Sequence, residues 1–237
     1  MPTQPSGDMR GKKCAAVLLG PQGSGKTTLA RSLAARNHIA VIETGNLLEK
    51  EIRRGTPLGQ EIKPYKSAGK LVPMELLQRV VSHELEQMPG DFVLFDGFPR
   101  SMGQIDLMEK IFQDRQLELC AVIILALDLQ IAEERLSGRR ICLQDGTLYN
   151  IHGNPPRQDG ICDRCGGKLI QRQDDQPEVV RERLGNYVRE TIPVIEYFRE
   201  KFKPLVREEP ATLPPEQLEE RVSRLFDQLI AQAPPKE

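Results

Sequence analysis

Apolar residues in this chain gather in short continuous runs separated by longer stretches with helical periodicity. The runs at 14–19, 39–43, 92–95 and 121–127 predict strands buried on both faces, and Leu205-Val206 indicates a shorter fifth strand. The stretches 27–37, 178–202 and 217–231 predict helices. Pro193 predicts a kink in the second of these helices. This alternation predicts an α/β protein with a parallel sheet that helices cover on both faces.

Two segments interrupt the alternation. Residues 44–72 are mostly polar and helical, whereas residues 141–176 are rich in Gly and Pro and lack a long periodic run. A segment like the second, without a core of its own, needs a staple or acts as a lid. Asp174 and Asp175 are candidates for capping the helix that follows it, and Pro177 suits the first turn of that helix. The predicted core comprises 14–43, 73–140 and 177–237.

Composition narrows the class of protein. The chain has 237 residues, enough for one core with inserted subdomains, and a formal net charge of −1. This charge gives no electrostatic reason to expect nucleic acid or an anionic membrane as a partner. No apolar run approaches the roughly 20 residues of a membrane span. Residues 1–13 are polar and lack an apolar signal core, so we expect a disordered tail and a cytosolic location.

The stretch Gly20–Thr27 fits the phosphate-binding pattern G-x-x-x-x-G-K-[ST] and lies between a predicted strand and a predicted helix. Its glycines let backbone N–H groups converge on an anion, and the following helix adds its positive end. We expect Lys26 to reach the terminal phosphates and Thr27 to hold Mg²⁺. The alternative, a glycine-rich turn with a chance Lys-Thr pair, does not account for the flanking elements. The stretch predicts binding of a nucleoside triphosphate.

A second motif, Asp96-Gly97-Phe98-Pro99-Arg100, follows the third predicted strand. A carboxylate at this position is where a ligand of hydrated Mg²⁺ is expected, which indicates Asp96. Arg100 projects from a Pro-containing turn and suits a second phosphate. The amide of Gln104 has the paired donor and acceptor that recognise an adenine edge. The alternative is a β-turn with a surface arginine.

Taken together, these motifs resemble the adenylate kinase family, in its long form with a lid. The matching segments are Gly20–Thr27, Thr44-Gly45, Gly69–Pro73, Asp96–Arg100 with Gln104, Arg135 with Gly138–Arg140, Asn154–Pro156, Arg172 with Asp174-Asp175, and Arg183. The resemblance implies the P-loop nucleoside monophosphate kinase fold, with a five-stranded parallel sheet flanked by helices. It also implies an AMP-binding insertion at 44–72, a lid at 141–176, and the reaction Mg·ATP + AMP ⇌ 2 ADP.

The resemblance carries site residues with it, and fixed guanidinium forks suit crowded phosphate oxygens. The expected catalytic cations are Lys26, Arg100, Arg135, Arg139, Arg172 and Arg183. The expected residues for ATP with its Mg²⁺ are Gly20, Gly23, Ser24, Gly25, Lys26, Thr27, Thr28, Asp96, Arg135 and Arg139. The expected AMP residues are Thr44, Gly45, Arg53, Val72, Gly97, Arg100, Gln104, Arg172 and Arg183. The expected partners are ATP, AMP and ADP alone, bound by a monomer.

Glu49 departs from the family pattern, because the family carries an arginine there that contacts the AMP phosphate. We hypothesise that Arg53 or Arg54, about one turn further on, partly replaces this contact, and we expect weak AMP binding. Two other functions stay open on the sequence alone. One is a nucleoside monophosphate kinase with another acceptor, and the other is a degenerate family member that only binds nucleotide.

Three of the five cysteines fall within the predicted lid. Cys142-x2-Asp145 and Cys162-x2-Cys165 have the spacing of a structural Zn²⁺ site, and carboxylate oxygen is an accepted ligand of Zn²⁺. A metal-free lid and a redox Cys162/Cys165 pair are the rival interpretations. His152 is an alternative fourth ligand whose spacing does not match. Cys14 and Cys120 lie in apolar runs and are predicted to be small buried side chains.

Overall fold

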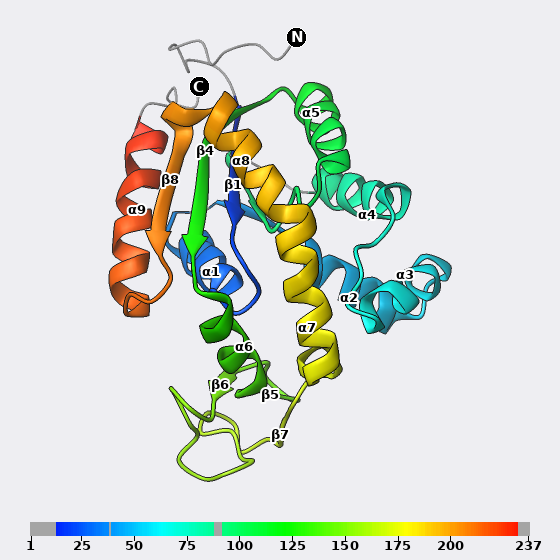
Figure 1. Cartoon of the computed structure of the whole chain (residues 1–237), viewed down its shortest axis with the longest axis vertical. Helices are drawn as coiled ribbons and strands as arrows, with labels where there is room; N and C mark the ends of the chain where they lie inside the picture. Colours follow the sequence, from blue (N-terminus) through cyan, green and yellow to red (C-terminus); the bar gives the residue numbers. More distant parts are fainter. Residues whose placement is uncertain (1–12, 38, 88–91, 232–237) are drawn as a thin grey trace.

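A parallel sheet of five strands forms the centre of the molecule, in the order β2-β3-β1-β4-β8 (Figure 1). We describe residues 13–37, 39–87 and 92–231 of a computed structural model. The strands are β1 (Lys13–Leu19), β2 (Ala40–Glu43), β3 (Phe92–Asp96), β4 (Leu117–Ala126) and β8 (Val206–Pro210). The predicted α/β fold is therefore confirmed. The predicted tail lies outside the described residues except for Lys13, which begins β1.

Alternate residues of β1 face two different layers of core. Ala15, Val17 and Leu19 pack with residues of α4 (Met74–Gln87), α5 (Gly103–Arg115) and α8 (Ile192–Lys201). Ala16 and Leu18 pack with residues of α1 (Lys26–Asn37) and α9 (Pro215–Ala231) on the opposite face. Because both faces are covered, the central strands are apolar over most of their length, which explains the runs in the sequence.

Cys14 and Cys120 are buried as predicted, but they are not separate side chains. A disulfide joins them across β1 and β4, with their Cα atoms 5.8 Å apart. The register between these strands shifts, so that Ala15 pairs with Leu119 and Ala16 with Ala121, and Cys120 is the extra residue. The expectation of two separate cysteines was wrong because the sequence does not show that these strands are neighbours.

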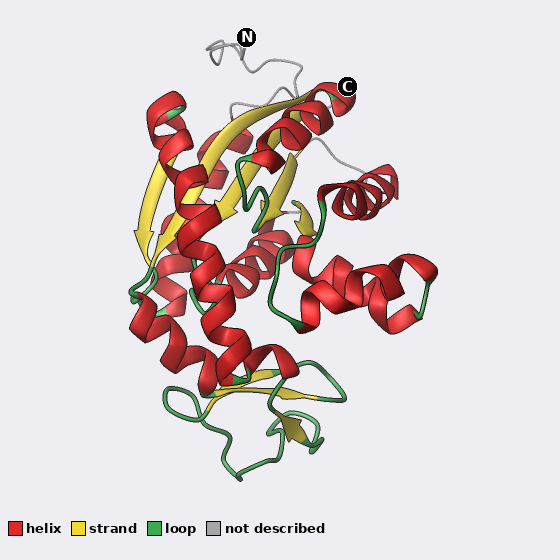
Figure 2. Cartoon of the chain, turned by 45° about the vertical axis from the view of Figure 1, so that its right-hand side comes forward, coloured by secondary structure: helices red, strands yellow, loops and turns green. Residues whose placement is uncertain are grey.

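Two segments extend away from the sheet, and Figure 2 shows them as separate lobes. One is a pair of helices, α2 (Thr44–Arg54) and α3 (Pro57–Ser67), joined by a turn in which Gly55 has a φ of 65°. The other follows α6 (Leu129–Ser137) and carries a small antiparallel sheet. Its strands are β5 (Arg139–Cys142), β6 (Leu148–Asn150) and β7 (Leu169–Ile170), a structure too short to show a period in the sequence.

The helix predicted over 178–202 is a continuous column with an irregular centre (Figure 1). It consists of α7 (Pro177–Asn186), a π-helical turn, η2 (Tyr187–Thr191), and α8. Pro193 has no N–H group for an ordinary α-helical hydrogen bond, so the turn before it takes the wider hydrogen-bonding pattern of a π-helix. A short 3-10 turn, η1 (Gln173–Asp175), precedes α7, and a second, η3 (Lys203–Leu205), precedes β8. Gln176 occupies the N-cap position of α7, so Asp174 and Asp175 are not its caps.

Candidate functional site

A cavity of about 720 Å³ lies where the carboxyl ends of the strands meet the helix pair and the small sheet. All six predicted catalytic cations line this cavity: Lys26, Arg100, Arg135, Arg139, Arg172 and Arg183. The first residue of α1, the turn after β3, α6, β5, the segment before α7 and α7 itself each supply one of these cations. The fold thus brings together cations that are far apart in the sequence.

Lys26 lies at the start of α1, under the loop that follows β1. Its ammonium donates hydrogen bonds to the carbonyls of Gly20, at 2.8 Å, and Pro21, at 2.7 Å. Burial lowers the pKa of Lys26 to about 7, and nearby Asp96 opposes this shift. Gly20 has a φ of 142°, and a Cβ there would meet the carbonyl oxygen of Leu125 at 2.6 Å, so only glycine fits.

Thr27 and Asp96 form the oxygen pair that the sequence predicts for Mg²⁺. The Thr27 hydroxyl donates to Asp96 Oδ2 at 2.5 Å, and both residues line the cavity beside Lys26. Burial raises the pKa of Asp96, although Lys26 and the Thr27 hydroxyl act in the opposite direction. Oxygen donors of this kind fit Mg²⁺, which takes one or two protein ligands and keeps its other positions for water and phosphate.

Arg100 is fixed by the turn after β3. Its Nε donates to the Gly97 carbonyl at 2.6 Å, and its backbone N–H donates to Gln104 Oε1 at 2.7 Å. A Cβ at Gly97, where φ is 68°, would lie 2.6 Å from Arg100 Nη2. The carbonyl of Arg100 accepts a hydrogen bond of 2.9 Å from the Thr191 hydroxyl in the π-helical turn. The turn, α5 and the long helical column therefore all orient this arginine.

Asp175 holds two arginines on the wall of the cavity that β5 and α7 form. Its side chain is fully buried and accepts two hydrogen bonds from Arg139, one of them from Nε at 2.8 Å. Arg183 Nη1 lies 3.8 Å from the same carboxylate and donates to the Asp174 carbonyl at 2.9 Å. Burial lowers the pKa of Arg183 to about 10. Asp175 therefore holds two of the predicted catalytic cations, Arg139 and Arg183, at fixed positions.

Not every predicted residue reaches the cavity surface. Gly23, Gly25, Thr27, Thr28, Gly45 and Asp96 line it together with the six cations. Behind its wall are buried residues: Gly20, Ser24, Thr44, Val72, Gly97 and Gln104. Thr44 is tied to this wall by hydrogen bonds from its hydroxyl to the carbonyls of Asp96, at 3.2 Å, and Gly97, at 3.4 Å.

The structure does not bring Arg53 to the cavity. Arg53 is exposed on α2, and Arg54 lines a separate cavity of about 450 Å³ between α2, α3 and α4. Lys66 of α3 lines the main cavity instead. Glu49 of α2 lines the main cavity, whereas neither Arg53 nor Arg54 is among its lining residues.

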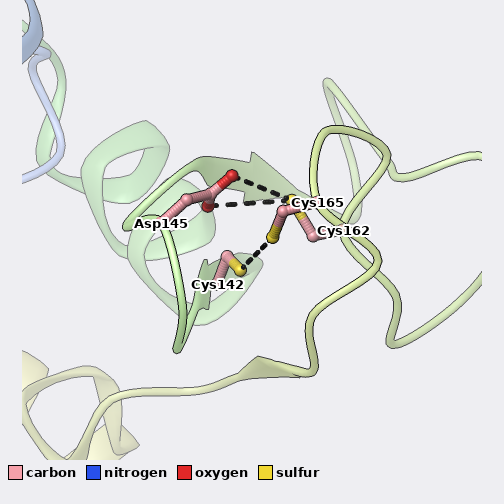
Figure 3. A group of neighbouring side chains, drawn as sticks. All are labelled: Cys142, Asp145, Cys162 and Cys165. Atoms are coloured by element: carbon pink, nitrogen blue, oxygen red, sulfur yellow. Dashed lines mark hydrogen bonds between the residues drawn. The ribbon is translucent and has the colours of Figure 1, made fainter.

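The remaining predicted residues form a compact cluster in the small sheet (Figure 3). Ligand atoms of Cys142, Asp145, Cys162 and Cys165 all lie within 4.8 Å of one another. The Cys142 and Cys165 sulfurs are 3.4 Å apart, and Cys162 Sγ lies 3.6 Å from Asp145 Oδ2. Tetrahedral Zn²⁺ with Zn–S bonds of about 2.3 Å requires sulfurs about 3.8 Å apart. The cluster therefore fits a zinc ion, and His152 is not part of it.

Two similar turns build this cluster. The amide of Gly146 donates to the Cys142 carbonyl, and the amide of Gly166 donates to the Cys162 carbonyl, with φ values of 72° and 71° at the two glycines. Asp145 thus stands in the first turn where Cys165 stands in the second. Burial acts against ionisation of Cys162, but hydrogen bonds from the Tyr149 hydroxyl and from the backbone of Cys165 and Arg164 lower its pKa to about 7. A lowered pKa favours the thiolate that binds metal.

The model of one protein family, adenylate kinase, matches residues 18–203. The chain belongs to the adenylate kinase family. It is 42% identical over 187 residues to an adenylate kinase of Desulfitobacterium hafniense, and 40% identical over 187 residues to one of Clostridium tetani. Each alignment covers 78% of this chain and 86% of the relative. An adenylate kinase of Pyrococcus furiosus is 37% identical over 185 residues, which cover 78% of this chain and 84% of the relative.

Family membership does not account for every residue that the cavity brings together. Lys66, Asp174 and the pair Arg31–Glu43 also line it, and sequence reasoning gave none of them a chemical role. Arg31 and Glu43 make two parallel hydrogen bonds of 2.7 and 2.8 Å from α1 to the end of β2. In this adenylate kinase family member, no helix among the described residues is both long and apolar enough to cross a membrane.

Proposed function

We propose that this protein catalyses the reversible transfer of the terminal phosphoryl group of Mg-bound ATP to AMP, which yields two ADP. One observation carries the proposal: a single cavity unites the P-loop lysine, the Thr27–Asp96 oxygen pair and the five predicted catalytic arginines. Phosphoryl transfer requires positioning and neutralisation of charge more than it requires covalent chemistry by the protein. Every group used lies in one chain, so the proposed site is complete without a residue from a partner.

The donor nucleotide occupies the side of the cavity formed by the loop after β1. Backbone N–H groups at Gly23 and Gly25 and the ammonium of Lys26 hold its phosphates, while Arg135 and Arg139 reach them from α6 and β5. Thr27 and Asp96 would hold Mg²⁺, which supplies neutralisation of the β- and γ-phosphate oxygens when bound. Arg135 is oriented by hydrogen bonds to the carbonyls of Ala211, at 2.9 Å, and Gly23, at 3.4 Å.

The acceptor occupies the side formed by residues 44–72 and the turn after β3. Gly45 borders the base and ribose, backed by the buried residues Thr44, Val72, Gly97 and Gln104, and Arg100 holds the phosphate. An oxygen of that phosphate bonds to the γ-phosphorus as the bond to the β–γ bridging oxygen breaks. Arg172 and Arg183 stabilise the charge on the transferred group.

Residues 141–176 are the lid in this proposal. Its closure brings the cations at its border onto the phosphates and excludes water, which otherwise competes as the acceptor. Cys142, Asp145, Cys162 and Cys165 would hold Zn²⁺, which would staple a segment with little apolar core of its own. That core is limited to Cys142, Tyr149, Cys162 and Leu169.

A coupled assay tests the proposal. Purified protein with Mg·ATP is offered AMP, GMP, CMP and UMP in turn, with Lys26→Ala as the blank. We expect rapid turnover with AMP and a loss of at least a hundredfold in kcat in the variant. Faster turnover with another monophosphate would move the acceptor assignment. ATP binding without turnover on any of the four would show a nucleotide-binding protein that is not a kinase.

A further inference from the structure

A row of ion pairs between side chains of alternating charge crosses the acceptor side of the cavity. Glu49 on α2 lies 3.3 Å from the Lys66 ammonium on α3 and 3.7 Å from Arg172 at the border of the lid. Lys66 in turn lies 3.1 Å from Asp174 Oδ2 in η1. All of these side chains line the main cavity. These ion pairs therefore connect α2 and α3 to the segment between the lid and α7.

The Glu49 carboxylate lies between two cations, Lys66 and Arg172. Both contacts are longer than a good charge-assisted hydrogen bond of about 2.8 Å. The side chains of Glu49 and Lys66 are 25% and 19% exposed, so water reaches both. Such partly solvated pairs are weak, and a stronger anion displaces them.

A phosphate group is such an anion. It carries up to two charges and three terminal oxygens, so it can bond to Lys66 and Arg172 at the same time at full strength. Asp174 does not prevent this, because an ammonium has three donors and Lys66 can keep Asp174 while it bonds to phosphate. Arg100, the cation proposed for the acceptor phosphate, lines the same cavity.

We propose that Lys66 binds the phosphate of the acceptor nucleotide, and that Glu49 is an internal competitor which this phosphate displaces from Lys66 and Arg172. The inference rests on the proposed function, because it assumes a nucleoside monophosphate on this side of the cavity. Glu49 lowers the affinity for the acceptor and leaves the affinity for ATP unaffected. Lys66 contributes to acceptor binding from α3, where sequence patterns gave no signal.

The test compares AMP binding and steady-state kinetics in variants of these two residues. Glu49→Gln keeps the shape of the side chain and removes its charge, so we expect the Kd and KM for AMP to fall about fivefold. Lys66→Met should raise both about tenfold, and Lys66→Arg should restore them to within about twofold. The KM for ATP should stay within about twofold of the wild-type value in every variant.

Matched controls come from the exposed face of α3. Glu61→Gln and Lys63→Met remove the same charges from exposed side chains of this helix, so we expect AMP constants within about twofold of wild type. Adenosine, which has no phosphate, is measured as a competitive inhibitor in each variant. Its inhibition constant should not change, because the competition concerns the phosphate alone.

Three outcomes would overturn the inference. They are an unchanged AMP Kd in Glu49→Gln, an unchanged AMP Kd in Lys66→Met, and an inhibition constant for adenosine that moves in parallel with that for AMP. Failure of the proposed function has a different signature, which is wild-type protein without phosphoryl transfer to AMP. Calorimetric AMP binding then still decides the roles of Glu49 and Lys66.

Discussion

Substitution of Asp175 by Asn should reduce both stability and turnover. The carboxylate is fully buried and is the shared partner of Arg139 and Arg183, whose side chains are 22% and 18% exposed. Breaking a buried ion pair costs about 3–5 kcal/mol because a charge stays buried without its partner. Water reaches both arginines in part, so we expect a loss at the lower limit, about 3 kcal/mol. For a chain of this size, such a loss lowers Tm by about 6–12 °C.

Urea unfolding followed by circular dichroism measures the change in the free energy of unfolding, and Asp159→Asn is the control. Asp159 is an exposed carboxylate in the proposed lid, so its substitution should change stability by no more than about 0.5 kcal/mol. We also expect kcat for AMP phosphorylation to fall at least tenfold in Asp175→Asn, since Arg139 and Arg183 lose their orientation. A loss of stability below about 1 kcal/mol would refute the idea that Asp175 compensates two buried charges.

Three further predictions concern the metal, the phosphate-binding lysine and the helical column. Protein purified without chelator should contain about one zinc per chain, and removal of the zinc by a chelator should lower Tm. The Cys162→Ser variant should bind far less zinc. A metal-free protein with the same Tm would exclude a zinc staple. Because the pKa of Lys26 is about 7, this residue is largely neutral at pH 8 and must gain a proton when phosphates bind. Calorimetry of ATP binding in buffers of different ionisation enthalpy should show uptake of nearly one proton at pH 8 and little at pH 6, and equal heats in all buffers at pH 8 would contradict this. Thr191→Val removes the hydrogen bond to the Arg100 carbonyl, which is worth about 1 kcal/mol, so the KM for AMP should rise about fivefold with the KM for ATP unchanged. A parallel rise in both constants would assign Thr191 a general structural role.

The sequence alone was enough to predict the structural features that depend on residues close together along the chain. The P-loop and the Asp96–Arg100 turn each follow a buried strand directly, so local pattern was enough to locate them. The edge strand β8 gave a weak signal because most of its residues are exposed. The start of β4 was missed because Glu118 interrupts the apolar run.

Contacts between residues far apart in the sequence could not be predicted from local patterns. Lys66 meets Asp174 across 108 positions, and Cys14 meets Cys120 across 106. Only the folded arrangement of helices and strands determines such pairs. Asp175 shows the difference clearly: its place before a helix indicates a cap, yet burial beside two arginines makes it their counter-charge.

The attachment of the small sheet also bears on how the protein can be rearranged. Its first strand begins at Arg139 and its last ends at Ile170, and both ends meet the core at one place. There Gln171 Nε2 donates to the Ser137 carbonyl at 3.3 Å, and Arg139 pairs with Asp175. A segment whose entry and exit are adjacent can be exchanged for one of different length with little cost in loop-closure entropy. Residues 139–170 thus form a unit whose length and metal ligands can change while the central sheet keeps its connections.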